Sequence, residues 1–209
     1  MKNIFDKLKF YILNPSGFLN KLLVKFNKLF LKKITINGNV YYSYKGYIYP
    51  QYLNKGNAVS FIKNKALKYC VGKGLDIGAG SWPLPGAIPV RDEELLNAYK
   101  LDIFEDGSLD YVFSSHCIEH LKYWKKALKL WVKKIKKGGI IFIYAPHKSM
   151  KLWLPLSPWV GEDHKWSPDF LILKEFLEEL GCEILSFEPE RDIYWSFYLI
   201  AVKRYDRIF

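Results

Sequence analysis

The stretch Leu75–Gly80, which reads LDIGAG, decides the predicted fold. An apolar run leads into two glycines separated by one residue, and Asp76 lies two residues before the first of them. Glycine lets a ligand approach the backbone where a Cβ atom would clash. Open α/β sheets bind ligands at the carboxyl ends of their strands. The stretch therefore predicts a ligand site at a strand end, and a carboxylate there suits a ligand with an ammonium group.

Two common nucleotide-binding patterns are absent around this stretch. The dinucleotide fingerprint G-x-G-x-x-G requires glycine at position 83, which is Pro83 here. The phosphate-binding pattern G-x-x-x-x-G-K-[ST] does not occur in the chain. The sequence therefore gives no sign of a site for a pyrophosphate.

Strand and helix patterns alternate along the chain from Gly74 onward. Buried apolar runs predict strands, and apolar residues at helical spacing predict helices. The strands are expected at 74–78, 87–90, 109–115, 140–145, 182–189 and 194–204, and the helices at 57–70, 118–137 and 167–181. We expect Gly138–Gly139 to end the second helix, and Ser167 to cap the third with Pro168 in its first turn. This alternation predicts an α/β fold with a Rossmann-like, doubly wound, mostly parallel sheet.

The first 56 residues form a predicted N-terminal extension to a domain of residues 57–209. Residues 1–33 are basic and amphipathic and predict two helices, which either pack on the domain or make a peripheral membrane contact. We favour packing. Residues 34–53 predict a tyrosine-rich hairpin with its turn at Asn37–Gly38. Its tyrosines either pack together or line a pocket for a polar substrate such as a sugar.

The composition is that of a globular protein, with 209 residues, of which 50% are hydrophobic and 17% aromatic. No apolar run reaches the roughly 20 residues of a membrane-spanning helix, and no secretory signal is evident. Three widely spaced cysteines indicate reduced thiols, so we expect a cytoplasmic protein. The net charge of +11 is concentrated in two lysine-rich stretches, 1–33 and 122–137. Such stretches occur in nucleic-acid binders and also in ordinary solvated helices.

Three motifs in fixed order carry a resemblance to a known family: LDIGAG at 75–80, FEDGSLDYVFSSHCIEHL at 104–121 and KKGGIIFIYAP at 136–146. Together they resemble the class I S-adenosylmethionine-dependent methyltransferases of the small-molecule group, and among these the methyltransferases of polysaccharide and capsule pathways. The resemblance implies S-adenosylmethionine as the cofactor. It implies that Asp76 and the turn Gly78–Ala79–Gly80 hold the methionine end, and that Ser115 and His116 face the sulfonium.

The resemblance also assigns the ribose and adenine contacts. Asp92, which follows the strand at 87–90, matches the acid that binds the ribose hydroxyls, and Asn97 and Ala98 stand where the family contacts adenine. The chain departs from the family here, because the segment SWPLPGA (81–87) is short and carries two prolines. Glu93 or Asp102 is therefore an alternative for the ribose contact.

The catalytic base of such an enzyme is predicted among the histidines. A hydroxyl acceptor needs a general base with a pKa near neutrality, and histidine is the usual choice. We select His147 or His164 as the base, with His116 nearby. The predicted acceptor is a small anionic molecule, such as a sugar nucleotide or a phosphorylated sugar, methylated on a hydroxyl or phosphate-type oxygen in surface-polysaccharide synthesis. No nucleic-acid partner is expected.

Two alternatives remain open. The lysine-rich stretches would also suit an RNA methyltransferase. The pattern His116-x-x-Glu119-His120 has the spacing of a zinc peptidase signature, so a zinc-dependent hydrolase is a second alternative. Because a strand is predicted to end at His116, we expect Glu119 and His120 to stabilise a helix start, and no metal site is predicted.

Overall fold

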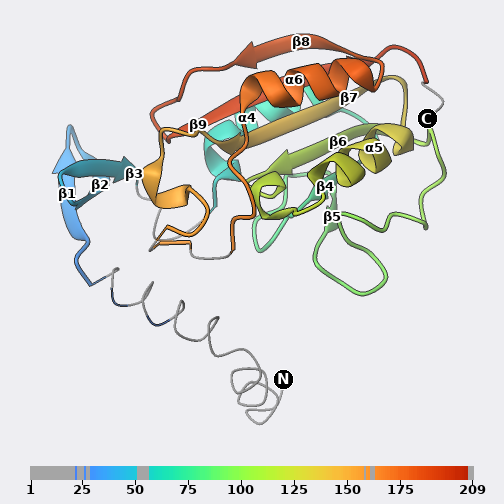
Figure 1. The fold of residues 1–209 in the computed structure, drawn as a ribbon. Coiled ribbons are helices and arrows are strands. Elements are labelled where there is room, and N and C mark those ends of the chain that lie inside the picture. The colour runs from blue at the N-terminus through green and yellow to red at the C-terminus, as the bar shows by residue number, and fades with distance from the viewer. Residues whose placement is uncertain are drawn as a thin grey trace.

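The computed structural model describes residues 22, 26, 29–50, 57–157, 159–160 and 163–206. Its centre is a six-stranded sheet with the strand order β5-β4-β6-β7-β9-β8 (Figure 1). The strands are β4 (Gly74–Ile77), β5 (Ile88–Val90), β6 (Leu109–Ser115), β7 (Ile135–Pro146), β8 (Cys182–Glu188) and β9 (Ser196–Lys203). The first four are parallel, and β9 runs antiparallel to both of its neighbours. The predicted Rossmann-like, mostly parallel sheet is confirmed.

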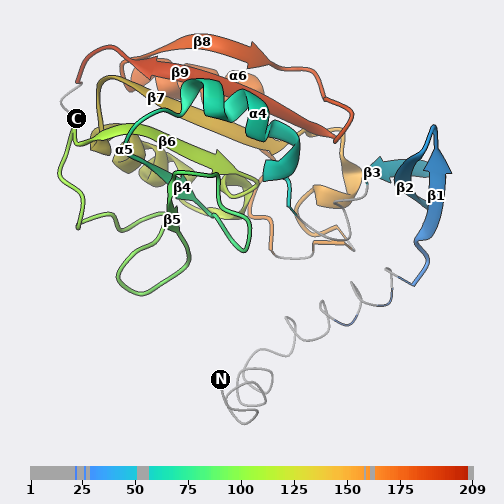
Figure 2. The ribbon, with the colours of Figure 1, turned by 180° about the vertical axis from the view of Figure 1, so that it is seen from behind.

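Helices cover both faces of this sheet, as a comparison of Figures 1 and 2 shows. Helix α4 (Val59–Tyr69) lies on one face, while α5 (Trp124–Lys134) and α6 (Phe170–Glu179) lie on the other. Strand β6 illustrates burial on both faces. Val112 packs in the core under α5 and α6, and the next residue, Phe113, packs in the core under α4. Burial on both faces explains why the central strands are apolar without alternation.

The predicted hairpin is the first part of a three-stranded antiparallel sheet, formed by β1 (Lys32–Ile36), β2 (Asn39–Tyr44) and β3 (Tyr47–Pro50). The turn at Asn37–Gly38 is confirmed, with φ angles of 49° and 78°. Both angles are positive, as a two-residue hairpin turn of this type requires. Lys45–Gly46 repeats the conformation with φ angles of 47° and 81° and adds the third strand, which was not predicted.

The small sheet contacts the main domain through aromatic side chains. Tyr44 and Tyr49 are buried, and the ring of Tyr49 lies 5.7 Å from that of Trp195. The Trp195 Nε1 group donates a hydrogen bond of 3.2 Å to the carbonyl oxygen of Ile48. At least these two tyrosines therefore pack against protein.

The two helices predicted within residues 1–33 lie almost entirely outside the described residues. Leu22 and Phe26 are helical and exposed, and Lys32–Lys33 belong to β1. Among the helices that the structure describes, none has the length and apolar character needed to cross a membrane.

The helix predicted at 118–137 is wrong in its bounds. A 3₁₀ turn, η1 (Ile118–His120), comes first, and α5 follows only at Trp124. Gly138–Gly139 does not end a helix but lies inside β7. A Cβ atom on Gly139 would meet the Asp110 carbonyl oxygen at 2.7 Å. Glycine is therefore required at position 139 because β7 lies close to the backbone of β6 there.

The cap of α6 was also predicted at the wrong residue. Asp169, and not Ser167, is the N-cap, and its carboxylate accepts a hydrogen bond of 3.0 Å from the backbone N–H of Leu171. Aspartate and serine are both preferred capping residues, so the kind of cap was predicted correctly but was placed two residues too early. Gly181, with a φ angle of 85°, follows the end of the helix as predicted.

Candidate cofactor and catalytic site

Asp76 lies at the carboxyl end of β4 and is almost fully buried. Its Oδ2 atom accepts a hydrogen bond of 2.7 Å from the Leu84 N–H, but Oδ1 has no partner among the described residues. Burial raises the pKa of the carboxyl to about 6, although the Leu84 hydrogen bond and the charge of Arg91 act in the opposite direction. One buried oxygen is therefore free to accept a donor or a cation.

The turn after β4 is anchored to the end of β5. The Gly78 N–H donates to the Val90 carbonyl at 2.9 Å, and Arg91 Nε donates to the Gly80 carbonyl at 2.9 Å. As predicted, the crossover between the two strands is short, because residues 78–87 form turns without a helix. The turn is therefore held by hydrogen bonds instead of by a helix.

The two glycines of this turn have different reasons to be glycine. A Cβ atom on Gly78, where φ is 84°, would come within 2.6 Å of the Cys117 Sγ atom. On Gly80, where φ is 51°, it would meet nothing nearer than the Gly78 carbonyl oxygen at 3.9 Å. Gly78 is thus required by packing within the chain. Only Gly80 borders open space of the kind that the ligand argument requires.

The end of β6 lies beside this turn, because Ile77 of β4 pairs with Ser114 of β6. Ser115, the last residue of β6, has a buried hydroxyl without a partner in the described ranges. His116 follows with a φ angle of 49°, and its N–H donates to the Tyr144 carbonyl at 2.8 Å. The predicted residues of both strand ends are thus brought to one edge of the sheet.

Asp92, Asn97 and Ala98 lie in the irregular segment between β5 and β6. Asp92 is exposed just beyond the end of β5. The Asn97 side chain is used locally, since its Nδ2 donates to the Glu93 carbonyl and its Oδ1 accepts from a backbone N–H. The Ala98 carbonyl accepts a hydrogen bond of 2.8 Å from Trp131 Nε1. Asp92 is therefore available to a ligand, whereas Asn97 and Ala98 have bonds that stabilise their own segment.

His147 stands at the carboxyl end of β7 and is partly exposed. The backbone N–H of Ser149 donates to its Nδ1 at 3.2 Å, and the Ser149 hydroxyl lies 2.7 Å from the same atom. In the neutral ring the proton is therefore on Nε2. Burial lowers the pKa of His147, with a further contribution from Lys148, so the ring is neutral at physiological pH.

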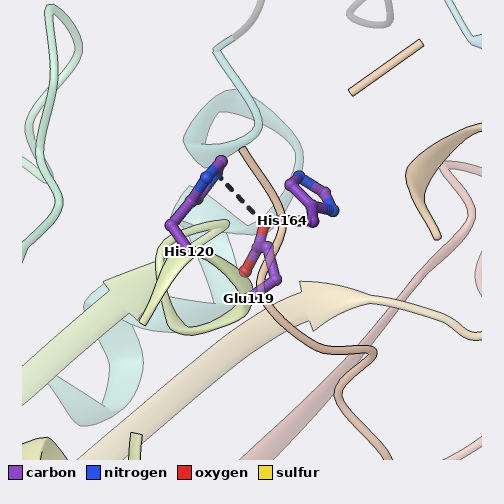
Figure 3. Close-up of side chains that lie close together, drawn as sticks. All are labelled: Glu119, His120 and His164. Atoms are coloured by element: carbon purple, nitrogen blue, oxygen red, sulfur yellow. Dashed lines mark ion pairs between the residues drawn. The ribbon is translucent and has the colours of Figure 1, made fainter. Parts of the chain in front are cut away.

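The other two predicted histidines gather around Glu119, together with His120. Figure 3 shows Glu119 between His120, from the same 3₁₀ turn, and His164, from a distant loop. Both Glu119 carboxylate oxygens are buried and lack hydrogen-bond partners within the described part of the chain. His116 Nδ1 lies 3.5 Å from Glu119 Oε1, and its Nε2 lies 2.9 Å from the Ser196 hydroxyl. Burial raises the pKa of Glu119 to about 7.

Burial also changes the pKa values of the histidines in this group. It lowers the pKa of His116 to about 3 and that of His164 to about 4, and the neighbouring histidines contribute in the same direction. Both rings are therefore neutral at physiological pH. Sequence reasoning found His116 and His164 as separate candidates. The sequence pattern grouped His116 with Glu119, but it did not predict the approach of His164, because no spacing rule relates residue 164 to residue 119.

The buried groups at the sheet edge fit S-adenosylmethionine, the cofactor that the motifs implied. The unpaired Asp76 Oδ1 offers an acceptor for the ammonium group, the unpaired Ser115 hydroxyl offers a second polar contact, and Gly80 borders open space. All three lie at or just beyond the carboxyl ends of the neighbouring parallel strands β4 and β6, where ligands of such sheets bind.

Comparison with known proteins points in the same direction. Residues 89–143 match the family described as "Methyltransferase domain". No curated protein sequence matches the chain significantly. The solved structures that resemble it include a chain of the complex between the Haloferax volcanii Trm112 methyltransferase activator and a methyltransferase, with a TM-score of 0.55 and 11% identity over 74% of this chain and 93% of that one.

Two further structures show the same fold. An S-adenosylmethionine-dependent methyltransferase from Listeria monocytogenes matches with a TM-score of 0.52 and 13% identity, over 70% of this chain and 100% of that one. The [4+2]-cyclase SpnF matches with a TM-score of 0.54 and 15% identity, over 70% of this chain and 82% of that one. At such identities the likeness shows the fold alone, and the cyclase is a reminder that one fold carries several chemistries. The domain match, the fold and the motifs together support an S-adenosylmethionine-dependent methyltransferase.

Proposed function

We propose that the protein transfers a methyl group from S-adenosylmethionine to an oxygen of a small anionic acceptor. The observation that carries this proposal is Asp76, a buried carboxylate with one unpaired oxygen directly before the Gly78–Gly80 turn. Leaving a buried charged group unpaired is costly, so such a group is expected to have a ligand partner. The matched domain family and the fold identify the ligand class.

We assign separate binding roles around the cofactor to individual residues of the chain. When bound, the cofactor supplies an electrophilic methyl group on a sulfonium. Asp76 would hold its ammonium group, Ser115 would contribute a second polar contact, and the exposed Asp92 would bind the ribose hydroxyls. The remaining task of the protein is to orient the acceptor oxygen, exclude water and accept the acceptor's proton.

Among the predicted bases, His147 fits the proton-accepting role best. A base must be neutral and reachable, and His147 is both, because it is partly exposed and its pKa is lowered. His164 is buried and the His116 side chain is only 15% exposed, and pKa values of about 3 for His116 and about 4 for His164 make them weak bases at neutral pH. Since the Ser149 hydroxyl lies 2.7 Å from His147 Nδ1, a proton from the acceptor would pass through this hydroxyl to the ring.

Cationic side chains near this sheet edge favour an anionic acceptor. Lys151 Nζ donates to the Tyr47 hydroxyl at 3.2 Å and so lies between the small sheet and the loop after β7. The Arg191 guanidinium stacks on the Trp195 ring at 3.8 Å. A phosphorylated sugar or a sugar nucleotide would complement these charges. The assignment to surface-polysaccharide synthesis rests on the sequence resemblance, and a peripheral membrane contact through residues 1–33 stays a prediction.

Calorimetric titration with S-adenosylhomocysteine tests the cofactor site. The wild type should bind the compound, and Asp76→Asn should bind it roughly 10- to 100-fold more weakly, because a hydrogen bond to a charged group is worth about 1.5–3 kcal/mol. Glu175→Gln removes an acid from the exposed face of α6 and serves as the matched control. Equal affinity in all three proteins would contradict the role of Asp76.

Transfer of a radiolabelled methyl group then tests the acceptor class. Phosphorylated sugars and nucleotide sugars are compared with neutral sugars and with RNA. The proposal expects label on the anionic sugars, with slower transfer in Lys151→Ala and Arg191→Ala. Label on RNA alone would replace this acceptor class with nucleic acid.

A further inference from the structure

We propose that Glu119, His120 and His164 form a binding site for a divalent transition-metal ion of the zinc class. Each of the three residues offers one ligand atom, and these atoms all lie within 4.8 Å of one another. The separation between His120 Nε2 and Glu119 Oε1 is 3.9 Å. Ligand bonds of about 2.0–2.2 Å would require only a modest contraction of this triangle. The site is independent of the methyl-transfer proposal.

The hydrogen bonds of the two histidines leave the correct nitrogen atoms for a metal. His120 Nδ1 lies 3.0 Å from the Asp163 carbonyl oxygen, and His164 Nδ1 lies 2.6 Å from the Trp153 carbonyl oxygen. A carbonyl only accepts hydrogen bonds, so each Nδ1 carries a proton, and in the neutral ring each Nε2 keeps its lone pair for a metal. Metal-binding histidines are commonly oriented in this way, with the second nitrogen bonded to a backbone carbonyl.

Glu119 gives the site its negative charge. Its side chain is fully buried, and neither carboxylate oxygen has a hydrogen-bond partner among the residues that the structure describes. Buried polar atoms are normally hydrogen-bonded, so two buried oxygens on one side chain without a hydrogen bond require a reason. A cation held between this carboxylate and the two imidazole rings would supply it. His116 Nδ1 lies 3.5 Å from Oε1 of the same carboxylate.

The site is built from two segments that are fixed to each other. The loop around His164 is hydrogen-bonded to η1 by the Lys165 N–H, which donates to the Glu119 carbonyl at 2.7 Å, and by Trp166 Nε1, which donates to the Ile118 carbonyl at 2.7 Å. These bonds hold the carboxylate and the distant imidazole together without an ion. Such preorganisation distinguishes a site from a chance meeting of side chains.

Access and ligand type define the class of ion. The His120 side chain is 44% exposed whereas Glu119 is fully buried, so the ion would enter from the His120 side and keep solvent or a substrate oxygen as a further ligand. Two imidazoles with one carboxylate suit Zn²⁺, Fe²⁺ or Co²⁺, whereas Mg²⁺ and Ca²⁺ prefer oxygen ligands throughout.

The test is titration of tag-free protein with Co²⁺, followed by visible absorption and then by displacement with Zn²⁺. The proposal expects one ion per chain, a coordination spectrum that Zn²⁺ removes, and affinity at least about tenfold weaker in His120→Ala and Glu119→Gln. His147→Ala removes the histidine outside the cluster and should leave the Co²⁺ affinity unchanged. A thiolate charge-transfer band would instead place the ion on a cysteine and overturn the assignment.

Folding and cofactor binding are checked on the same variants. The exposed His120 side chain can be removed without opening the core, so His120→Ala should retain the circular dichroism of the wild type and its affinity for S-adenosylhomocysteine. Failure of the wild type to bind Co²⁺ or Zn²⁺ would overturn the metal site and leave the methyltransferase proposal intact. Equal metal affinity in the wild type and both ligand variants would overturn it as well.

Discussion

Asp76→Asn should weaken cofactor binding and at the same time stabilise the fold. The carboxyl group is buried with one unpaired oxygen, and its pKa of about 6 in the fold exceeds the ordinary value of 3.8. A raised pKa means that the folded state disfavours the charged form. The group therefore contributes most to stability when it is protonated, below pH 4, and this contribution is lost as the pH rises through about 6.

The size of the effect follows from the two pKa values. The interval between 3.8 and about 6 corresponds to roughly 3 kcal/mol, which is the cost of ionising Asp76 in the fold at pH 8. Asparagine carries no charge and can still accept the Leu84 hydrogen bond, but its amide N–H₂ would lack an acceptor. We expect a net increase of about 1–3 kcal/mol in the free energy of unfolding at pH 8 and less than about 1 kcal/mol at pH 4.

Urea unfolding at the two pH values measures this difference directly. The wild type and Asp76→Asn are compared without ligand, with Glu175→Gln as the control for the loss of an acid. A gain in stability that grows from pH 4 to pH 8, together with weaker S-adenosylhomocysteine binding, would show that Asp76 binds the ligand at the expense of the stability of the fold. A difference that does not depend on pH, or a loss of stability at pH 8, would refute the reasoning.

Four further substitutions test the packing that positions the site. Gly78→Ala should lower the free energy of unfolding by about 2–4 kcal/mol, because the new Cβ atom adds a clash to a positive φ. Gly80→Ala should lower it by about 1–2 kcal/mol and should act mainly on ligand affinity. Urea unfolding measures the change in stability, and calorimetry measures the change in affinity. Asp169→Ala should cost about 0.5–2 kcal/mol through loss of the α6 cap, and the asparagine variant should recover much of it in thermal unfolding. Trp131→Phe removes the hydrogen bond to the Ala98 carbonyl, so it should cost about 1–3 kcal/mol and speed proteolytic cleavage between β5 and β6.

The sheet was predictable because its strands are buried on both faces. The run 140–145 is apolar without interruption, the run 109–115 has consecutive apolar residues at its centre, and the structure contains them in β7 and β6. The Asn37–Gly38 turn was predictable from its dipeptide alone. Helix boundaries were less predictable, because the lysine-rich stretch after η1 continues at helical spacing into residues that the structure places in β7. There, pairing with β6 outweighs helix propensity.

The candidate site was predictable only where one segment supplies it. Asp76 and the glycine turn follow from six consecutive residues, and the structure adds that Gly78 is required by Cys117 instead of by a ligand. The Ala98 carbonyl is bonded to a tryptophan of α5 that lies 33 residues further along the chain. Contacts between such distant positions are made by the fold, and no periodicity or spacing in the sequence encodes them.

The pattern His116-x-x-Glu119-His120 also shows that spacing in the sequence does not determine which side chains meet in the fold. Read as one helical metal motif, it would make the two histidines the ligand pair. In the structure a strand ends before His116, a 3₁₀ turn follows, and His116 Nε2 bonds to Ser196. The second imidazole beside Glu119 and His120 comes instead from His164, which the loop hydrogen bonds bring to η1. Metal chemistry at this place therefore depends on the docking of that loop, so disrupting the Trp166 hydrogen bond should weaken metal binding although no ligand is changed.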